Sequence, residues 1–153
     1  MDATALAARL LEPIPANLTA GIEVVRAADC SAEVVCEAPG RLANVIGSLH
    51  ASGLVALVDA TGLAALIAAV EDERQFDGVI PLGSVARLRF HRPARGRLTA
   101  TCTLDATARA ALQPLLSGEE RRATLTTTVA IHDEDDVLVC NGAFDWKLRR
   151  ITN

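Results

Sequence analysis

Three residues of types that often take part in catalysis lie close together near the middle of this 153-residue chain. Asn44 is followed six residues later by His50, and His50 is followed nine residues later by Asp59. Asp59 is the only ionisable residue between positions 51 and 70, where the others are apolar, small or hydroxyl-bearing. Burying a charged carboxylate in such a segment is costly, so it must be neutral, paired or kept for a chemical task.

The segments around this stretch predict how it is positioned. The apolar run 51–70 predicts a long helix, hydrophobic on all sides, that must be covered on most of them. A membrane span is disfavoured because Asp59 and Thr61 lie near its middle and strand-like segments flank it. The predicted order is a helix at 3–12, strands at 22–28 and 32–37, the long helix, strands at 79–91 and 97–104, a short helix within 105–117, and strands at 122–132 and 137–149.

This order predicts one α+β domain, residues 1–153, in which a curved antiparallel sheet wraps around a long central helix. Ser48 or Ser52 is expected to cap the start of the long helix. In the strand at 79–91, the alternation predicts that Arg87 and Arg89 lie on the opposite face from the apolar residues between them.

The composition excludes several classes of partner. A net charge of −4 and a pI near 5.3 give no reason to expect nucleic acid or an anionic membrane. Aromatic residues make up only 3%, which argues against stacking platforms for single-stranded nucleic acid. The four cysteines have no Cys-x-x-Cys spacing and no histidine at a metal-ligand distance. We therefore expect reduced cysteines, no metal, no resident cofactor and a cytoplasmic location.

The stretch from Asn44 to Asp59 resembles a known family, the hotdog-fold acyl-CoA thioesterases of the phenylacetate-pathway and human thioesterase-superfamily type. These proteins combine an Asn, an apolar-x-Gly-Thr/Ser stretch, His-Gly-Gly and an acidic residue on the following helix, at matching spacings. The sequence Phe-His-Arg-Pro-Ala-Arg-Gly at 90–96 is similar to their aromatic-x-x-Pro-Ala-Lys/Arg-Gly turn. The resemblance extends over roughly 20–149 by strand order and is specific across 44–59 and 90–96.

The resemblance implies a hotdog fold and a homodimer, often doubled to a tetramer, with the active site between subunits and an acyl-CoA as substrate. Asp59 would be the general base or nucleophile of one subunit. Asn44 and His50 would come from the other subunit, together with the Ala51 N–H as the oxyanion donor. Independently of the family, the start of a helix offers unpaired N–H groups suited to an oxyanion.

Two departures from the family pattern concern the substrate site. Ala51 and Ser52 stand where the family has two glycines, and Gly83 stands where related enzymes often have Ser or Thr, with Ser84 beside it. Ser52, Gly83 and Ser84 are nevertheless candidates for contact with the substrate. The remaining candidates, for the phosphates of coenzyme A, are Arg87 and Arg89.

The sequence leaves two alternatives to a thioesterase. One is a hotdog domain that binds acyl groups or coenzyme A, or serves as a scaffold, without turnover, and the departures at Ala51, Ser52 and Gly83 keep it open. The other is a hotdog dehydratase, which would need a His/Asp or His/Glu pair in a different register. The spacing of His50 and Asp59 fits the thioesterase pattern better.

Overall fold

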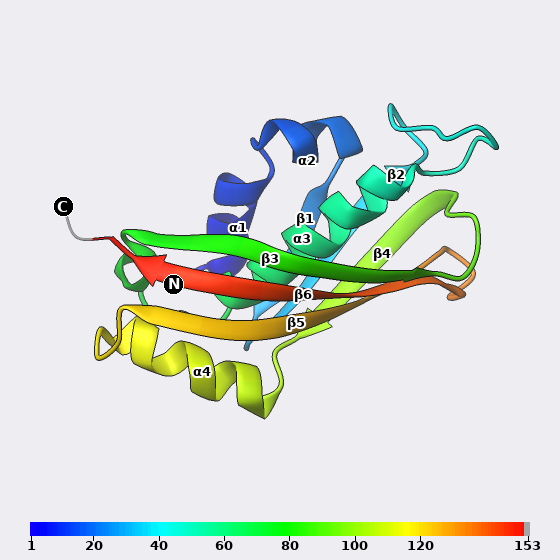
Figure 1. Cartoon of the computed structure of the whole chain (residues 1–153). Helices are drawn as coiled ribbons and strands as arrows, with labels where there is room; N and C mark the ends of the chain where they lie inside the picture. The colour runs from blue at the N-terminus through cyan, green and yellow to red at the C-terminus, as the bar shows by residue number, and fades with distance from the viewer. Residues whose placement is uncertain (152–153) are drawn as a thin grey trace.

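Six antiparallel strands form one sheet that curves around a long helix, as predicted (Figure 1). The computed structural model describes residues 1–151, so the last two residues of the predicted domain lie outside the description. The elements are α1 (Ala3–Leu11), α2 (Pro15–Ala20), β1 (Glu23–Ala28), β2 (Ser31–Ala38), α3 (Ala51–Ile67), the 3-10 helix η1 (Glu73–Phe76), β3 (Val79–Phe90), β4 (Gly96–Thr103), α4 (Ala106–Ser117), β5 (Arg122–His132) and β6 (Leu138–Arg150).

The strand order is β1-β2-β4-β5-β6-β3, which leaves β1 and β3 at the two edges of the sheet. Helix α1 packs on β1, whereas β3 is exposed over nearly its whole length. A long edge strand that exposes apolar side chains is a template for pairing with another chain. The edge formed by β3 is therefore the open side of this protomer.

Helix α3 is the core of the domain, and its small residues allow the sheet to approach it closely. A Cβ at Gly62 would lie 2.6 Å from the Thr127 hydroxyl, and Val58 lies against Gly142. The Thr127 hydroxyl accepts a hydrogen bond from the indole of Trp146 (2.9 Å), which is buried as a packing residue. No helix among the described residues is long and apolar enough to cross a membrane.

Several local features differ from the sequence predictions. Pro15 begins the additional helix α2, because its fixed φ suits a first helical position. The cap of α3 is His50, not Ser48 or Ser52. A bulge between Gly83 and Val85 interrupts the alternation of β3.

The insertion α4 lies beside the half of β5 that β4 does not pair with, and buries three leucines there (Figure 1).

Arg150, near the end of β6, joins three segments through its guanidinium group. It donates hydrogen bonds to the carbonyl oxygens of Asp77 (2.6 Å), Gln75 (2.7 Å) and Leu115 (2.9 Å). Asp77 directly follows η1, Gln75 lies within η1, and Leu115 lies in α4. A half-buried guanidinium thus holds the insertion against the end of the sheet.

We expect Arg150→Met to lower the free energy of unfolding by about 2–3 kcal/mol, because three carbonyls lose a charged donor. Arg149→Met, at the exposed neighbouring position, is the matched control and should change it by less than about 0.5 kcal/mol. Urea unfolding at one protein concentration measures both. Equal effects of the two substitutions would contradict a specific role for Arg150.

Candidate functional site

The loop before α3 is organised by the side chain of Asn44. Its Oδ1 accepts hydrogen bonds from the N–H groups of Ile46 (3.1 Å) and Ser48 (3.0 Å), and its Nδ2 donates to the Ser48 hydroxyl (2.7 Å). Gly47 adopts a left-handed conformation (φ 71°) that closes the loop. In this protomer both polar atoms of the Asn44 amide therefore serve the loop.

His50 caps the helix through its imidazole ring. The Ser52 N–H donates to His50 Nδ1 (3.0 Å), and the Ser52 hydroxyl lies 2.8 Å from the same nitrogen. Because a backbone N–H only donates, Nδ1 must act as the acceptor, and the neutral ring carries its proton on Nε2. Nδ1 thus caps the helix, and Nε2 carries an exposed N–H that can donate a hydrogen bond.

At the start of α3, the N–H of Ala51 has no hydrogen-bond partner among residues 1–151. The N–H of Ser52 binds the His50 ring, and the N–H of Gly53 binds the His50 carbonyl (2.9 Å). A cavity of about 330 Å³ opens beside Ala51, and it is also lined by Asn44 and by the end of β3 around Phe90. The first turn of α3 therefore has a residue that lines a cavity and whose N–H has no partner among the described residues.

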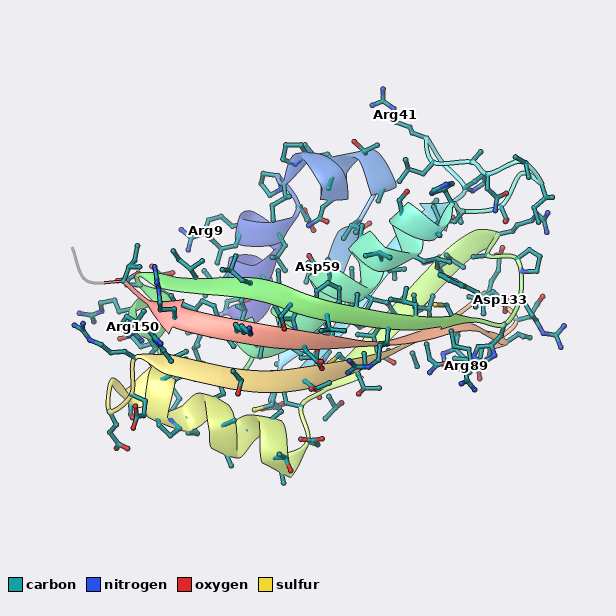
Figure 2. The ribbon with its side chains drawn as sticks, viewed as in Figure 1. Arg9, Arg41, Asp59, Arg89, Asp133 and Arg150 are labelled. Atoms are coloured by element: carbon teal, nitrogen blue, oxygen red, sulfur yellow. The ribbon has the colours of Figure 1, made fainter. Side chains whose placement is uncertain are left out.

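Asp59 lies two turns further along, on the face of α3 that the sheet, α1 and α2 leave partly open (Figure 2). Val55, Ala56 and Leu63 share that half-exposed face at helical spacing. No donor among the described residues pairs with the carboxylate. Burial raises the pKa of the Asp59 carboxyl from 3.8 to about 6, because desolvation disfavours its charged form.

Gly83 is itself exposed, but an aromatic ring fills the space into which a side chain at this position would point. A Cβ at this position would overlap the ring of Phe144, which stacks on Trp146 with ring centroids 4.8 Å apart. The phenyl ring thus occupies the space that a Ser or Thr side chain would need. The absence of a hydroxyl at this position has a direct packing cause.

Arg87 and Arg89 lie on the outer face of the sheet, opposite the interior that holds Asp59. The side chain between them, Leu88, packs inward near Gly142. Arg87 donates two hydrogen bonds to Asp145 (2.8 and 2.9 Å), which holds the pKa of that carboxyl below its usual value. Figure 2 shows Arg89 below the sheet, on the far side from Asp59. The arginine stripe is not brought together with the carboxylate within one protomer.

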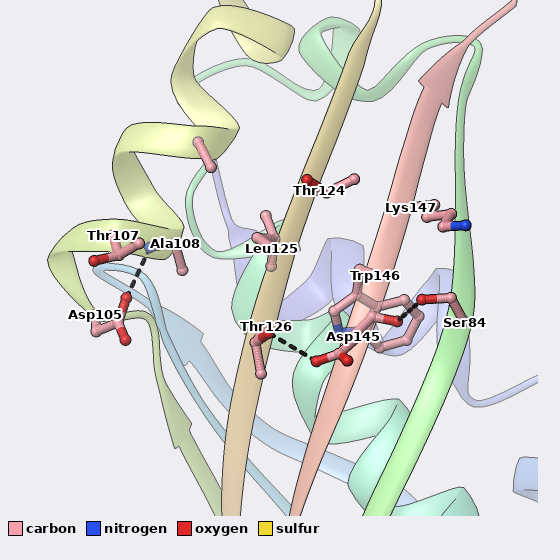
Figure 3. Close-up of a pocket in the computed structure, with 11 residues that line it drawn as sticks. Ser84, Asp105, Thr107, Ala108, Thr124, Leu125, Thr126, Asp145, Trp146 and Lys147 are labelled. Carbon is pink, nitrogen blue, oxygen red and sulfur yellow. Dashed lines mark hydrogen bonds between the residues drawn. The ribbon is translucent and has the colours of Figure 1, made fainter.

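Ser84 lies at the bulge in β3 and lines a separate cavity of about 420 Å³ (Figure 3). Its hydroxyl donates to the Asp145 carbonyl (3.0 Å), and α4 forms the opposite wall. The candidates predicted from sequence therefore fall into three places. These are the start of α3 (Asn44, His50, Ala51, Ser52), the open face of α3 (Asp59), and strand β3, where Gly83 faces Phe144 and where Ser84, Arg87 and Arg89 lie on the outer sheet face.

Comparison with known proteins places the chain in a family. Residues 4–148 match the model of a domain of unknown function, DUF4442. The chain belongs to this DUF4442 family. No curated protein is similar enough in sequence to count as a relative.

Solved structures share the fold of this DUF4442 domain along nearly the whole chain. A Pseudomonas aeruginosa protein of unknown function, described as a probable thioesterase, is 26% identical with a TM-score of 0.77, over 97% of this chain and 96% of that one. A Haemophilus influenzae thioesterase is 20% identical with a TM-score of 0.68, over 94% of this chain and 88% of that one. The predicted hotdog fold of the thioesterase superfamily is confirmed.

Sequence reasoning did not place Ile46, Phe90 and Arg95 at the cavity of this DUF4442 domain. Ile46 and Phe90 line it, and the Arg95 guanidinium donates to the Ile46 carbonyl (2.7 Å). All three lie within the two stretches that resemble the thioesterases. Their proximity depends on the turn after β3 folding back onto the loop before α3, which the spacing of residues does not reveal.

The raised pKa of Asp59 predicts a pH-dependent cost to stability. The folded-state pKa of about 6 lies above 3.8, so the contribution of this group to stability is full below about pH 4 and is lost as the pH rises to about 6. Asp59→Asn should therefore raise the free energy of unfolding by about 1–3 kcal/mol near pH 8 and change it little near pH 3.5.

Urea unfolding of both proteins across this pH range measures the difference. Glu119→Gln, which replaces an exposed carboxylate, is the control and should follow the wild-type curve. A constant difference between wild type and Asp59→Asn from acid to alkaline pH would show that Asp59 does not titrate as described.

Proposed function

We propose that this protein is an acyl-CoA thioesterase that hydrolyses a thioester with Asp59 as general base or nucleophile. The observation that carries the proposal is the unpaired carboxylate on the open face of α3, with its pKa raised to about 6. With a pKa of about 6 such a group is mostly ionised at neutral pH, and it is a stronger base than an exposed carboxylate. The thioesterase descriptions of the structural relatives support the same class of reaction.

The spacing of Asp59 and Ala51 supports a site shared between two protomers. They are eight residues apart on one helix, which is about 12 Å along its axis. One thioester carbonyl group cannot contact both the Ala51 N–H and the carboxylate across that distance. A second protomer would supply the missing partner in each of two equivalent sites.

The exposed edge of β3 supports pairing with a second copy of the chain. Strand β3 has 12 residues and no partner on its outer side, and it exposes Leu82, Val85 and Phe90. Pairing of two such edges would satisfy the backbone groups and bury these side chains. We propose a homodimer built on this edge, which can double to a dimer of dimers.

In the proposed reaction, water attacks the thioester carbonyl carbon, or the Asp59 carboxylate attacks first and water then hydrolyses the resulting anhydride. The Ala51 N–H of the other protomer stabilises the oxyanion, together with the positive end of the helix dipole. The carbon–sulfur bond breaks, and the thiolate of coenzyme A takes up a proton. His50 and Ser52 hold the helix start in the geometry that presents this donor.

Two observations favour the non-catalytic alternative, a domain that binds an acyl group or coenzyme A without turnover. Both polar atoms of the Asn44 amide are engaged in the loop, and Phe144 covers Gly83. Neither position offers a group that orients water. In that case Asp59 would be a carboxyl at the protomer interface.

We expect Asp59→Asn to lower kcat at least about 10²-fold on an acyl-CoA that the wild type cleaves, the effect of losing a general base or nucleophile. Because the base must be ionised, wild-type kcat/KM should fall as the pH drops through about 6. Thiol release from a series of acyl-CoAs measures both. Wild-type turnover in the Asn variant would remove Asp59 from the mechanism, and no cleavage of any acyl-CoA would favour the binding domain.

Replacing Ala51 tests the oxyanion donor by removing one N–H. Proline is tolerated at a first helical position, and His50 (φ −60°, ψ 150°) has the extended conformation that a residue before proline needs. We expect Ala51→Pro to lower kcat about 10²–10³-fold. Ala51→Ser keeps the N–H and is the control, with kcat within a few-fold of wild type.

Mixing the two inactive variants then tests whether the site is shared. A mixed dimer of Asp59→Asn and Ala51→Pro chains contains one site with both groups intact. After unfolding and refolding together, random assembly should restore about a quarter of wild-type activity. Sites contained within single protomers predict no recovery.

A further inference from the structure

The loop Asn44–Ser48 holds two apolar side chains on a backbone that is already fixed. Val45 is 102% exposed and Ile46 is 57% exposed. The Ile46 N–H donates to Asn44 Oδ1 (3.1 Å), and the Ile46 carbonyl accepts from Arg95 (2.7 Å). With both backbone polar groups hydrogen-bonded, the position of Ile46 is set before any ligand arrives.

The two residues of the loop tip differ in what they face. Ile46 lines the cavity of about 330 Å³ beside Ala51, and Phe90, which is 53% exposed, lines the same cavity from the end of β3. Val45 does not line it. Ile46 and Phe90 are thus large apolar residues, far apart in sequence, that border a single space next to the free N–H of Ala51.

The lining of this cavity favours an apolar occupant. Its polar residues Asn44 and Ser48 are hydrogen-bonded to each other, and the His91 ring is hydrogen-bonded to Asn141 Oδ1 (2.5 Å). Apart from Arg92, the lining offers few free partners to the amide groups of a pantetheine arm, and buried amides without partners are costly. The other lining residues are one charged residue, Arg92, and the apolar Leu49, Ala51, Leu54, Pro93 and Ala94.

We infer that Ile46 and Phe90 select the acyl group, by forming the walls of the space that receives its first carbons beside the thioester carbonyl. The inference rests on the proposed thioesterase function and adds the substrate class. A volume of about 330 Å³ is at the lower end of the range for small-molecule pockets, about 300–1,000 Å³. It suits an apolar acyl group that is a single ring or a short-to-medium chain. Arg95 is the positioning residue that fixes the Ile46 backbone.

The test compares two neighbouring positions on the loop. Ile46→Trp should lower kcat/KM at least about tenfold for phenylacetyl-CoA and medium-chain acyl-CoA, but less than about threefold for acetyl-CoA, because a pocket rejects a group by the size it excludes. Ile46→Ala should move the preferred chain to a longer one. Val45→Trp and Val45→Ala are the matched controls and should leave the acyl preference unchanged.

The outcomes separate the inference from the function on which it rests. If wild type cleaves acyl-CoA in an Asp59-dependent way but the Ile46 variants keep its acyl preference, the inference is wrong and the thioesterase function remains. An equal change at Val45 would also overturn it, since a general disturbance of the loop would then be the cause. If wild type cleaves no acyl-CoA, both proposals are wrong. Thermal unfolding of each variant verifies that the loop substitutions leave the fold intact.

Discussion

The burial of Asp59 on a helix that the sheet, α1 and α2 leave only partly open is the constraint on which the rest of this structure depends. Because α3 is apolar all round, the sheet must curve around it and come close, and small residues such as Gly62 and Gly142 allow that approach. A single carboxylate is tolerable only on the remaining open face, where water still reaches it. The same partial burial that makes the carboxylate costly raises its pKa to about 6 and makes it useful as a base.

The start of α3 shows how the hydrogen bonds of a helix end are divided between folding and function. Four N–H groups at a helix start have no partner within the helix. Here the His50 ring takes that of Ser52 and the His50 carbonyl takes that of Gly53, so the cap does not consume the N–H of Ala51. A Ser or Asn cap would satisfy the same donors. A His cap in addition leaves an exposed Nε2–H beside the site.

The sequence predicted the features that depend on local pattern and missed those that depend on distant contacts. Apolar periodicity located the long helix, and alternation in β3 placed Arg87 on the outer face, as the bond to Asp145 confirms. The three carbonyls around Arg150 come from segments more than 30 residues away, so no local pattern indicates them. The resemblance predicted one site from Asn44, His50 and Asp59, and within one protomer Asp59 lies two turns away from the other two. The cavity that Ile46 shares with Phe90 appears only when the turn after β3 is folded back.

The packing at Gly83 explains how the site differs chemically from the thioesterases it resembles. A hydroxyl-bearing side chain there would require Phe144 to move, and Phe144 is held by its stacking on Trp146, whose indole is in turn bonded to Thr127. The residue at position 83 and the residue at position 144 therefore depend on each other. Where related thioesterases often have a hydroxyl-bearing side chain, this protein has an aromatic ring beside the apolar helix. In the proposed reaction the carboxylate of Asp59 would then be the group that handles water, which is consistent with a base whose pKa is already raised by its surroundings.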